Sequence, residues 1–187
     1  PVLTSKVLSI ANSVIYGYSG ITSVKQAILK VLGVQKLQAL VITILSAETL
    51  PVEEHDFSYN AFWQHSIVAA QVSTVICEAS GVKKSEQFPI YIAAMLHNIG
   101  HLGLAHCLAE GYRELEHEGL SSLDWTQQLH LQKLRLGIHS IQVTEILLNL
   151  WNFPEEVIGI LRNSNACQDF FEPNKNNVTT PLAHTLH

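Results

Sequence analysis

Apolar residues recur every three or four positions along almost the whole chain of 187 residues, and this spacing constrains its fold most strongly. Such a period places apolar side chains on one face of a helix. Between positions 24 and 33 one face is apolar throughout: Val24, Ala27, Ile28, Val31 and Leu32. No convincing alternation of polar and apolar residues, which would indicate a strand, occurs anywhere in the sequence. The sequence therefore predicts an all-α protein, built as a multi-helix bundle.

Capping signals set the ends of the first predicted helices. Ser23 and Gln26 match a capping box, in which two side chains satisfy free backbone N–H groups reciprocally. Gly33 suits the left-handed residue that ends such a helix. A second apolar series runs over 34–45 toward Pro51, where a helix must stop. We expect these two stretches to form a helical hairpin.

A long helix is predicted over 60–80, with Gly81 as its stop. Its apolar residues are expected to face inward in part: Phe62, Ile67, Ala70, Val72, Val75 and Ile76. Pro89 is expected to open the next helix, over 90–97, because its missing N–H costs nothing in a first turn. Gly100 and Gly103 are then expected to loosen the backbone.

The remaining segments follow the same logic. Residues 108–122 are rich in glutamate and are predicted to be a solvated connection. Asp124 or Ser122 can cap a helix that runs to Leu136. Further helices are predicted over 140–150 and from Pro154 to Leu161.

The polar segment 51–58 is the best candidate boundary within the chain. We predict a single domain over 1–187, with an N-terminal helical lobe over 1–56 packed on a second lobe over 57–187. Because the chain lacks an initial Met, we expect it to be a piece of a longer protein. The second lobe is expected to be incomplete at its C-terminal end.

Composition excludes several classes of protein. Hydrophobic residues make up 47% and charged residues only 14%, which excludes a disordered linker. The formal net charge of -5 argues against a nucleic-acid partner. Uninterrupted apolar runs are all shorter than about 18 residues, so we expect no membrane span. Cys77, Cys107 and Cys167 form no CxxC pair, which is typical of the reducing cytoplasm.

Chemistry in such a chain would come from its ten histidines. His97 and His101 have the spacing of two zinc ligands on one helix, but Asn98 stands where a zinc protease needs a glutamate base. Gly100 also indicates that the helix ends before His101, so a structural, half-buried histidine is the preferred interpretation there. The isolated histidines His106, His117 and His130 are interpreted in the same way. No phosphate-binding glycine loop and no GxSxG elbow is present.

Several segments together resemble the HD-related output domain (HDOD) family. The N-terminal signature is LSIANS at 8–13, which includes Asn12 and Ser13, followed by Tyr16 and Gly17. FWQHS at 62–66, with Trp63, resembles the middle motif, and LHNIG at 96–100, with Gly100, resembles the family's LHDIG segment. The LGI segment at 136–138 and WNFPEE at 151–156, with Trp151 and Pro154, match a later stretch. The family implies an N-terminal helical bundle and a lobe that resembles HD phosphohydrolases.

HD phosphohydrolases hold one or two metal ions with a His, a His-Asp pair and a later Asp. Carried across, the resemblance places the first His at His65 and the second at His97. The Asp of the pair corresponds to Asn98, and the late Asp corresponds to His184 in LAH at 182–184. Ser140, preceded by His139, stands where metal-rich relatives have a further His, and positions 164–165 hold Ser and Asn in place of a terminal His pair.

Both carboxylates of this ligand set are thus replaced by neutral groups. Asn98 offers an amide oxygen without charge, whereas Mg²⁺ and Mn²⁺ prefer anionic oxygens. If any ion binds, its ligands would be His65, His97 and His184, which suit a transition ion such as zinc. We therefore interpret the site as vestigial, with no catalytic residue and no cofactor.

The resulting hypothesis is a non-catalytic bacterial signalling module in the cytoplasm. Its partners would be another signalling protein, another domain of its own chain or a second copy in a homodimer. The mean hydropathy of +0.18 is compatible with an apolar docking face. Two alternatives stay open: a residual metal-dependent phosphohydrolase acting on a nucleotide or cyclic dinucleotide, and a small-ligand sensor that uses the same pocket. Asn12, Ser13, Trp63 and Trp151 are expected to have structural roles only.

Overall fold

A computed structural model of the chain describes residues 2–12, 16–17, 19–53 and 57–166. All regular structure in these ranges is helical, which confirms the all-α prediction. The elements run in the order α1 (Val2–Ala11), α2 (Val24–Gln26), a π-helical turn η2 (Ala27–Leu32), α3 (Gly33–Glu48), α4 (Tyr59–Ala79), α5 (Lys84–Leu96), α6 (Ile99–Cys107), α7 (Ala109–His117), a 3-10 turn η3 (Leu120–Ser122), α8 (Trp125–Leu136), α9 (Ser140–Leu150) and α10 (Glu155–Ala166).

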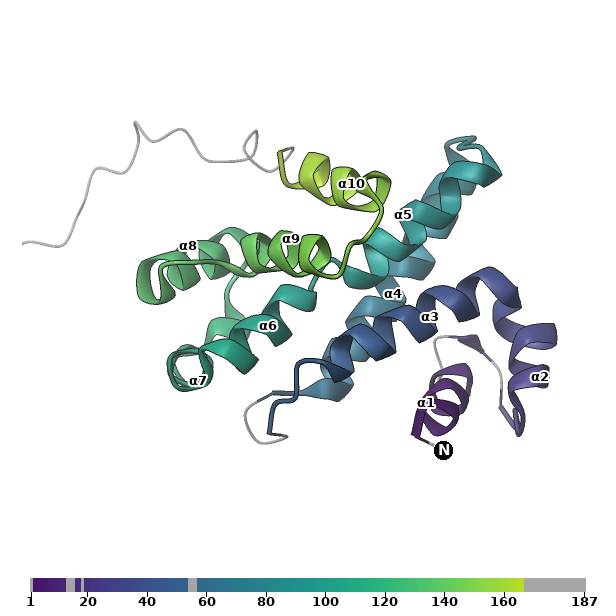
Figure 1. The fold of residues 1–187 in the computed structure, drawn as a ribbon, viewed down its shortest axis with the longest axis horizontal. Coiled ribbons are helices and arrows are strands. Elements are labelled where there is room, and N and C mark those ends of the chain that lie inside the picture. The colour runs from purple at the N-terminus through teal and green to yellow at the C-terminus, as the bar shows by residue number, and fades with distance from the viewer. Residues whose placement is uncertain (1, 13–15, 18, 54–56, 167–187) are drawn as a thin grey trace, which may run out of the picture.

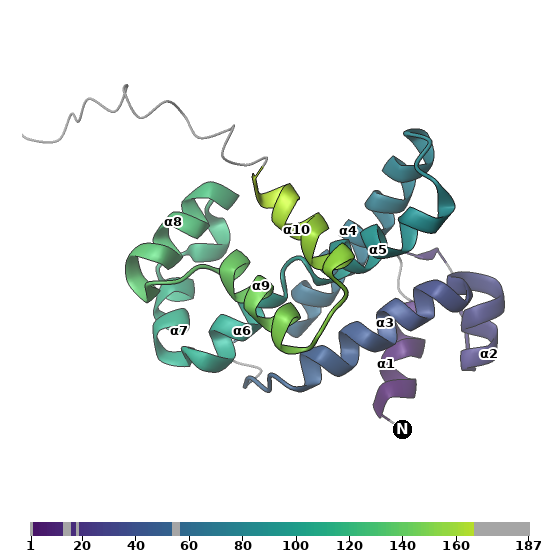
Figure 2. The same ribbon diagram turned by 45° about the horizontal axis from the view of Figure 1, so that its top comes forward.

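The molecule is elongated, with α3, α4 and α5 crossing near its middle (Figure 1). Helices α1 and α2 lie at one end, and α6 to α9 lie at the other, an arrangement also visible in Figure 2. The closest packing joins α4 to α5 and α6 to α9, and α5 also contacts α3 and α10. The larger of two apolar clusters includes Val7 of α1, Leu40 of α3, Met95 of α5 and Leu148 of α9, so it runs through both predicted lobes. The smaller cluster lies around Leu104, Leu115 and Leu120.

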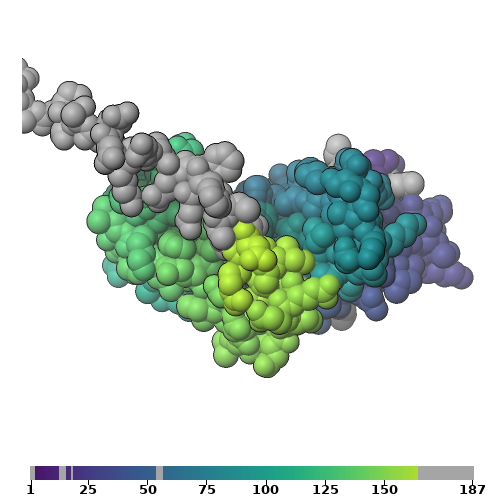
Figure 3. All heavy atoms as spheres, turned by 90° about the horizontal axis from the view of Figure 1, so that it is seen from above, coloured from purple at the N-terminus to yellow at the C-terminus, as the bar shows by residue number. Residues whose placement is uncertain are grey.

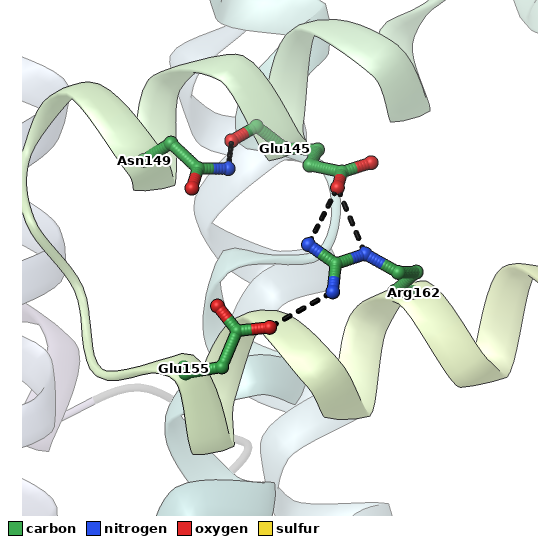
Figure 4. A network of polar contacts seen from close by, with 4 residues as sticks. All are labelled: Glu145, Asn149, Glu155 and Arg162. Atoms are coloured by element: carbon green, nitrogen blue, oxygen red, sulfur yellow. Dashed lines mark hydrogen bonds and ion pairs between the residues drawn. The ribbon is translucent and has the colours of Figure 1, made fainter.

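Helix α10 is held by an arginine as well as by apolar contacts. It packs on α5 and α9 and lies between them in the space-filling view (Figure 3). The Arg162 guanidinium lies 2.8 Å from the Glu145 carboxylate of α9 and 2.8 Å from the Glu155 carboxylate of its own helix (Figure 4). These two carboxylates raise the pKa of Arg162. The contact fixes α10 against the helix that carries Ser140.

The first predicted helix has the expected start but a different end. The backbone N–H of Gln26 donates to Ser23 Oγ, as a capping box requires. The side-chain Oε1 of Gln26, however, accepts from the backbone N–H of Thr22 instead of that of Ser23. Gly33 has the expected positive φ of 70°, yet its ψ of 173° is not left-handed helical. The backbone continues directly into α3, so Gly33 marks a junction after a π-helical turn.

Two expectations about α5 and α6 were wrong. Helix α5 begins at Lys84, and Pro89 lies inside it. Because proline has no backbone N–H, the helical hydrogen bond from position 89 to the Ser85 carbonyl is missing, and the second turn of α5 forms without it. Gly100 and Gly103 do not loosen the backbone either, because both are buried in α6 where it packs on α9. The chain breaks before Gly100, at His97 and Asn98, and His101 is helical.

The glutamate-rich segment was wrongly predicted to be a solvated connection. It contains α7 and η3, with Tyr112, Leu115 and Leu120 buried. Glu110, Glu114 and Glu118 are exposed, while Leu108, Tyr112 and Leu115 recur at helical spacing. That spacing was the signal that the acidic composition obscured.

Later elements agree with prediction. Asp124 and Gln127 form a full capping box at the start of α8, Gly137 ends it with a φ of 75°, and Pro154 precedes α10. Gly81 follows α4 with a φ of 69°. Within α4, however, three residues predicted to turn inward are exposed: Val72, Val75 and Ile76.

One described helix is long and apolar enough, by length and composition alone, to cross a membrane. It is the continuous stretch Val24–Glu48, and 28% of its most apolar 18-residue window is buried inside the structure. The sequence has no uninterrupted apolar run of this length, and the absence of a membrane span stays a prediction. Lys84–Cys107 and Ala109–His117 pass the same test only when taken together, across a bend of 111°. Core helices also pass this test.

Candidate functional site

His65 and His97 face each other across the junction of α4 and α5. His65 lies one and a half turns into α4, and His97 ends α5, with their Nε2 atoms 3.0 Å apart. His97 Nδ1 lies 2.8 Å from the Ala94 carbonyl oxygen, which can only accept, so Nδ1 carries the proton. In the neutral pair His97 Nε2 is therefore the acceptor and His65 Nε2–H the donor. Burial is the main cause that lowers the pKa of His97, and the nearby His65 lowers it further.

Asn98 uses its amide oxygen internally. The hydroxyl of Ser66, fully buried in α4, donates to Asn98 Oδ1 at 2.9 Å. Asn98 itself is 8% exposed. This oxygen is uncharged and already accepts one hydrogen bond, and the Nδ2 group has no lone pair available to ligate a cation. Asn98 serves here as a buried link between α4 and the start of α6.

Ser140 lies behind these residues, at the start of α9. It is buried, and its backbone N–H donates to Gln132 Oε1 at 2.8 Å. Ser140 Oγ and Gln132 Nε2 have no hydrogen-bond partner among the described residues. His139 is the N-cap of α9, and its Nδ1 accepts from the backbone N–H of Gln142. Neither side chain reaches the His65–His97 pair in the way a ligand would.

The other residues singled out from the sequence lie elsewhere. Asn12 ties the end of α1 to Ile21 through two hydrogen bonds and makes a third to the Leu8 carbonyl of α1, and Gly17 has a φ of 66°. Trp63 and Trp151 are partly buried against the core, and Pro154 precedes α10. Ser13 and His184 lie outside the described residues, as do the side chains at 164–165.

A second polar cluster lies beside the histidine pair. His101 Nδ1, in α6, lies 3.1 Å from the hydroxyl of Tyr112 in α7. Burial raises the pKa of Tyr112, and the adjacent Glu116 carboxylate raises it further. Ser121 donates to Glu116 at 2.5 Å. Burial lowers the pKa of His101 to about 4, so its imidazole is neutral at physiological pH.

Both clusters border one open pocket of about 680 Å³ between the start of α4 and helices α6, α7 and α8. Its apolar and aromatic lining consists of Phe57, Ala61, Phe62, Tyr112 and Trp125. Its polar lining consists of Ser58, His65, Asn98, His101, Glu116, Ser121 and Gln128. The volume falls in the range typical of small-molecule sites.

Comparison with known families decides the classification. The HDOD domain family matches residues 1–167, nearly the full length. The chain belongs to the HDOD family. No curated protein matches the sequence.

Solved structures with the same fold are longer than this HDOD chain. A candidate phosphohydrolase from Shewanella amazonensis has 21% identity and a TM-score of 0.65, covering 90% of this chain and 58% of its own. A candidate signal transduction protein from Marinobacter aquaeolei has 26% identity and a TM-score of 0.62, covering 95% of this chain and 39% of its own. An HDOD domain protein of unknown function from Geobacter sulfurreducens has 20% identity and a TM-score of 0.61, covering 86% and 52%. The chain therefore spans 39–58% of the length of these structures.

The described residues do not fit the dinuclear metal centre that the HD resemblance implies. Such a centre needs anionic oxygens to bridge and neutralise two cations. Here Asn98 supplies an uncharged oxygen that already accepts from Ser66. Among the residues that the structure describes, no group of three or more His, Cys, Asp or Glu side chains is arranged to hold a metal ion. His65 and His97 alone leave any ion mostly to solvent.

Sequence reasoning found the HDOD histidine pair and missed the His101–Tyr112–Glu116 cluster. Motif correspondence could locate His65, His97 and Asn98, because each lies in a segment similar to the family pattern. Tyr112 and Glu116 lie in no such motif, and their proximity to His101 depends on the turn between α6 and α7. The helical spacing in 108–115 was the one available signal.

Proposed function

We propose that this HDOD chain is a non-catalytic regulatory module of bacterial signal transduction, located in the cytoplasm. It acts by contacts with another signalling protein or another domain. One observation carries the proposal: Ser66 donates at 2.9 Å to the uncharged oxygen of Asn98, the residue that the resemblance aligns with the carboxylate of the HD pair. Family membership and the name of the Marinobacter aquaeolei protein, at 26% identity, support a signalling-related role.

The chemical argument concerns charge. Hydrolysis of a phosphoester by two metal ions requires the protein to hold both cations and to leave open positions for water and phosphate. At this site the nearest described candidates are two imidazoles, one of which donates its Nε2 proton to the other. An ion bound by both Nε2 atoms would first have to replace that hydrogen bond. We therefore assign the pair a structural role between α4 and α5.

A residual phosphohydrolase is the second candidate, favoured by the two Nε2 atoms that face each other at 3.0 Å. The two candidates differ in metal-dependent turnover. We would measure hydrolysis of bis(p-nitrophenyl) phosphate and of a cyclic dinucleotide with added Mn²⁺ or Zn²⁺, using His97→Ala as the background. The regulatory proposal expects wild type and His97→Ala to be equal. Turnover in wild type that His97→Ala abolishes would overturn it.

Asn98→Asp tests whether the missing charge is the deciding feature. The variant is nearly isosteric and restores a carboxylate beside His97. We expect it to bind Mn²⁺ at least about tenfold more tightly than wild type, since an anionic oxygen adds one or more kcal/mol to a divalent-ion site. Equal Mn²⁺ affinity in both proteins would contradict the argument from charge.

The surface for regulatory contacts is assigned to an exposed apolar row on α4. Val68, Val72, Val75 and Ile76 lie on one helix face, and we call them the α4 stripe. Each is between 45% and 65% exposed. Contiguous apolar side chains of this kind mark interaction surfaces more often than single exposed residues do.

The partner is expected to present an amphipathic helix with an acidic residue. Three residues of the α4 stripe, Val72, Val75 and Ile76, line a groove of about 400 Å³. Its other lining residues are Tyr16, Val31, Lys36 and Gln71. Lys36 Nζ lies 3.2 Å from Gln71 Oε1 and 5.5 Å from the centre of the Tyr91 ring. An apolar helix face fits the valines, and a carboxylate next to it would pair with the Lys36 ammonium.

Site-specific photocrosslinking tests this assignment. A benzophenone amino acid would replace Val75 in one protein and Leu134, which is 70% exposed on α8, in the matched control. We expect the probe at 75 to link to one segment with an apolar helical pattern and an acidic residue, identified by mass spectrometry. That segment could belong to the same chain, to a second copy or to another protein. Links at 75 that are no more abundant than at 134, or that go to lipid, would contradict the assignment.

A further inference from the structure

The pocket between α4, α6, α7 and α8 has features that no docking role explains. It holds about 680 Å³, and a helix-packing defect of that size would normally be filled by side chains. Its walls carry aromatic rings and polar groups, of which Asn98 is buried and His101 and Glu116 are half-buried. The combination of an apolar wall with a few convergent polar atoms is typical of a small-molecule site.

The aromatic side chains enclose one part of the pocket. The Phe57 ring lies 5.8 Å from the Phe62 ring and 6.5 Å from the Tyr112 ring, measured between centres. On another side the indole of Trp125 lies 6.3 Å from the imidazole of His101. Rings arranged in this way offer faces and edges to a flat ligand, so that planar molecules are favoured over branched aliphatic ones.

Two polar side chains of the pocket can accept hydrogen bonds. Glu116 is a carboxylate that can only accept, and it accepts from Ser121 at 2.5 Å. His101 Nδ1 and the Tyr112 hydroxyl lie 3.1 Å apart, and in the tautomer that carries its proton on Nδ1 the imidazole donates to Tyr112. In the neutral imidazole this leaves Nε2 as an acceptor. A ligand would therefore present N–H or O–H donors to His101 and Glu116.

Asn98 adds the complementary group. Its Oδ1 accepts from Ser66, which fixes the orientation of the amide. Its Nδ2 has no hydrogen-bond partner among the described residues, and Asn98 borders the pocket. The amide can thus donate to an acceptor atom of a ligand. A molecule with donors on one edge and an acceptor on another would satisfy these groups together.

The charge of the described pocket lining disfavours phosphate groups. Glu116 is the one formally charged residue among the described lining residues, and none of these is Lys or Arg. Phosphate sites usually combine free N–H groups at a helix start, such as those of α4, α6 and α8 that reach this pocket, with arginine or lysine, which the described lining lacks. A phosphate placed here would lose water and meet a carboxylate.

We propose that this pocket binds a planar nitrogen heterocycle that carries no phosphate, of the nucleobase or nucleoside class. The aromatic walls stack the ring, Glu116 and His101 accept from its N–H groups, and Asn98 donates to a ring nitrogen or carbonyl. This goes beyond the regulatory role, since the pocket and the α4 stripe are separate surfaces. A ligand in the pocket would contact α4, α6, α7 and α8 at once.

The first test needs only the wild-type chain. Saturation-transfer NMR and calorimetry would compare adenosine, guanosine, cytidine and uridine with their 5′-monophosphates. We expect at least one nucleoside to bind saturably and its monophosphate to bind at least about tenfold more weakly, because the added anion faces Glu116. No saturable nucleoside binding up to about 10 mM, or a monophosphate that binds as tightly as its nucleoside, would overturn the proposal.

A pair of glutamate variants locates the binding. Glu116→Gln removes the carboxylate in the pocket, whereas Glu114→Gln removes one on the same helix that lies outside the lining and pairs with Arg135. We expect Glu116→Gln to reduce the preference for nucleoside over monophosphate by at least about threefold and Glu114→Gln to leave it unchanged. Equal preferences in both variants would place the ligand elsewhere and contradict the assignment. Binding is measured without turnover, so failure here leaves the regulatory proposal intact.

Discussion

Gly100 lies so close to Ser140 that no side chain fits between them. A Cβ atom built on Gly100 would lie 1.8 Å from the Ser140 carbonyl oxygen and 2.7 Å from Thr144 Oγ1. The Gly100 N–H donates to the same Thr144 hydroxyl at 3.0 Å. The glycine of the LHNIG segment thus allows α6 to approach α9, and this packing holds His97 and Asn98 in place.

Gly100→Ala is therefore expected to separate α6 from α9. Because the obstacle is backbone, a helix must move, and we expect a loss of about 3 kcal/mol in the free energy of unfolding. Gly159→Ala in α10 is the matched control, since nothing lies within 4 Å of its Cβ position. That variant should be stabilised by up to about 1 kcal/mol through helix propensity. Urea unfolding followed by circular dichroism measures both, and equal stabilities of the two variants would contradict this account.

His101 makes stability depend on pH in the weakly acid range. Burial lowers its folded-state pKa to about 4, whereas an unfolded histidine titrates near 6.5. Between these values the unfolded chain binds a proton that the folded chain does not. Stability contributed by neutral His101 is therefore complete above pH 6.5 and is lost as the pH falls toward 4, by up to about 3 kcal/mol. The lowered pKa of His97 acts in the same direction.

We expect the free energy of unfolding of His101→Phe to depend less steeply on pH between 6.5 and 4 than that of wild type. The carboxylates contribute to the slope of both proteins equally, so the difference reports the imidazole. Urea unfolding at half-unit steps of pH gives the two slopes. Superimposable slopes would show that His101 titrates normally in the folded state.

Sequence reasoning succeeded where structure is decided locally. The caps at Ser23 and Asp124 and the ends at Gly81 and Gly137 depend on contacts within a few residues, so a short pattern contains the necessary information. The family motifs located His65 and His97 for the same reason, since each lies in a recognisable short segment.

It failed where the outcome depends on which elements meet. Val75 was predicted to turn inward because it is apolar, but which face of α4 is covered is decided by the position of α3 and α5. Gly103 was predicted to loosen the backbone, but it is helical because Val143 and Leu147 of α9 fill the adjacent space. His101, a polar residue of the pocket lining, lies next to Tyr112 only because the chain turns between α6 and α7.

Metal removal is expected to leave the fold unchanged. The core that joins α1 to α10 is apolar, and His65 and His97 are linked by a hydrogen bond that needs no ion. We expect treatment with EDTA to shift the midpoint of thermal unfolding by less than about 1 °C, since the loss of a bound structural ion would cost several kcal/mol. A larger decrease that Mn²⁺ or Zn²⁺ reverses would contradict the vestigial interpretation of this site.

Asn12 offers a test of the N-terminal signature. Its Nδ2 donates to the carbonyl oxygens of Leu8 and Ile21, and its Oδ1 accepts from the Ile21 N–H, each at 2.8 Å. Asn12→Ala loses all three hydrogen bonds, and we expect a loss of about 2 kcal/mol in the free energy of unfolding. Asn149→Ala is the control, because that exposed amide donates only to the Glu145 carbonyl of its own helix.

Asn12→Asp separates hydrogen bonding from shape. The aspartate has nearly the same size and keeps the acceptor for Ile21, but its ionised carboxylate cannot donate and faces two carbonyl oxygens. We expect it to be at least as destabilised as Asn12→Ala at pH 7 and to recover partly near pH 4, where the carboxylate takes up a proton. Stability measured by urea unfolding at both pH values decides the point, since an aspartate variant as stable as wild type at pH 7 would mean that the two donated hydrogen bonds contribute nothing.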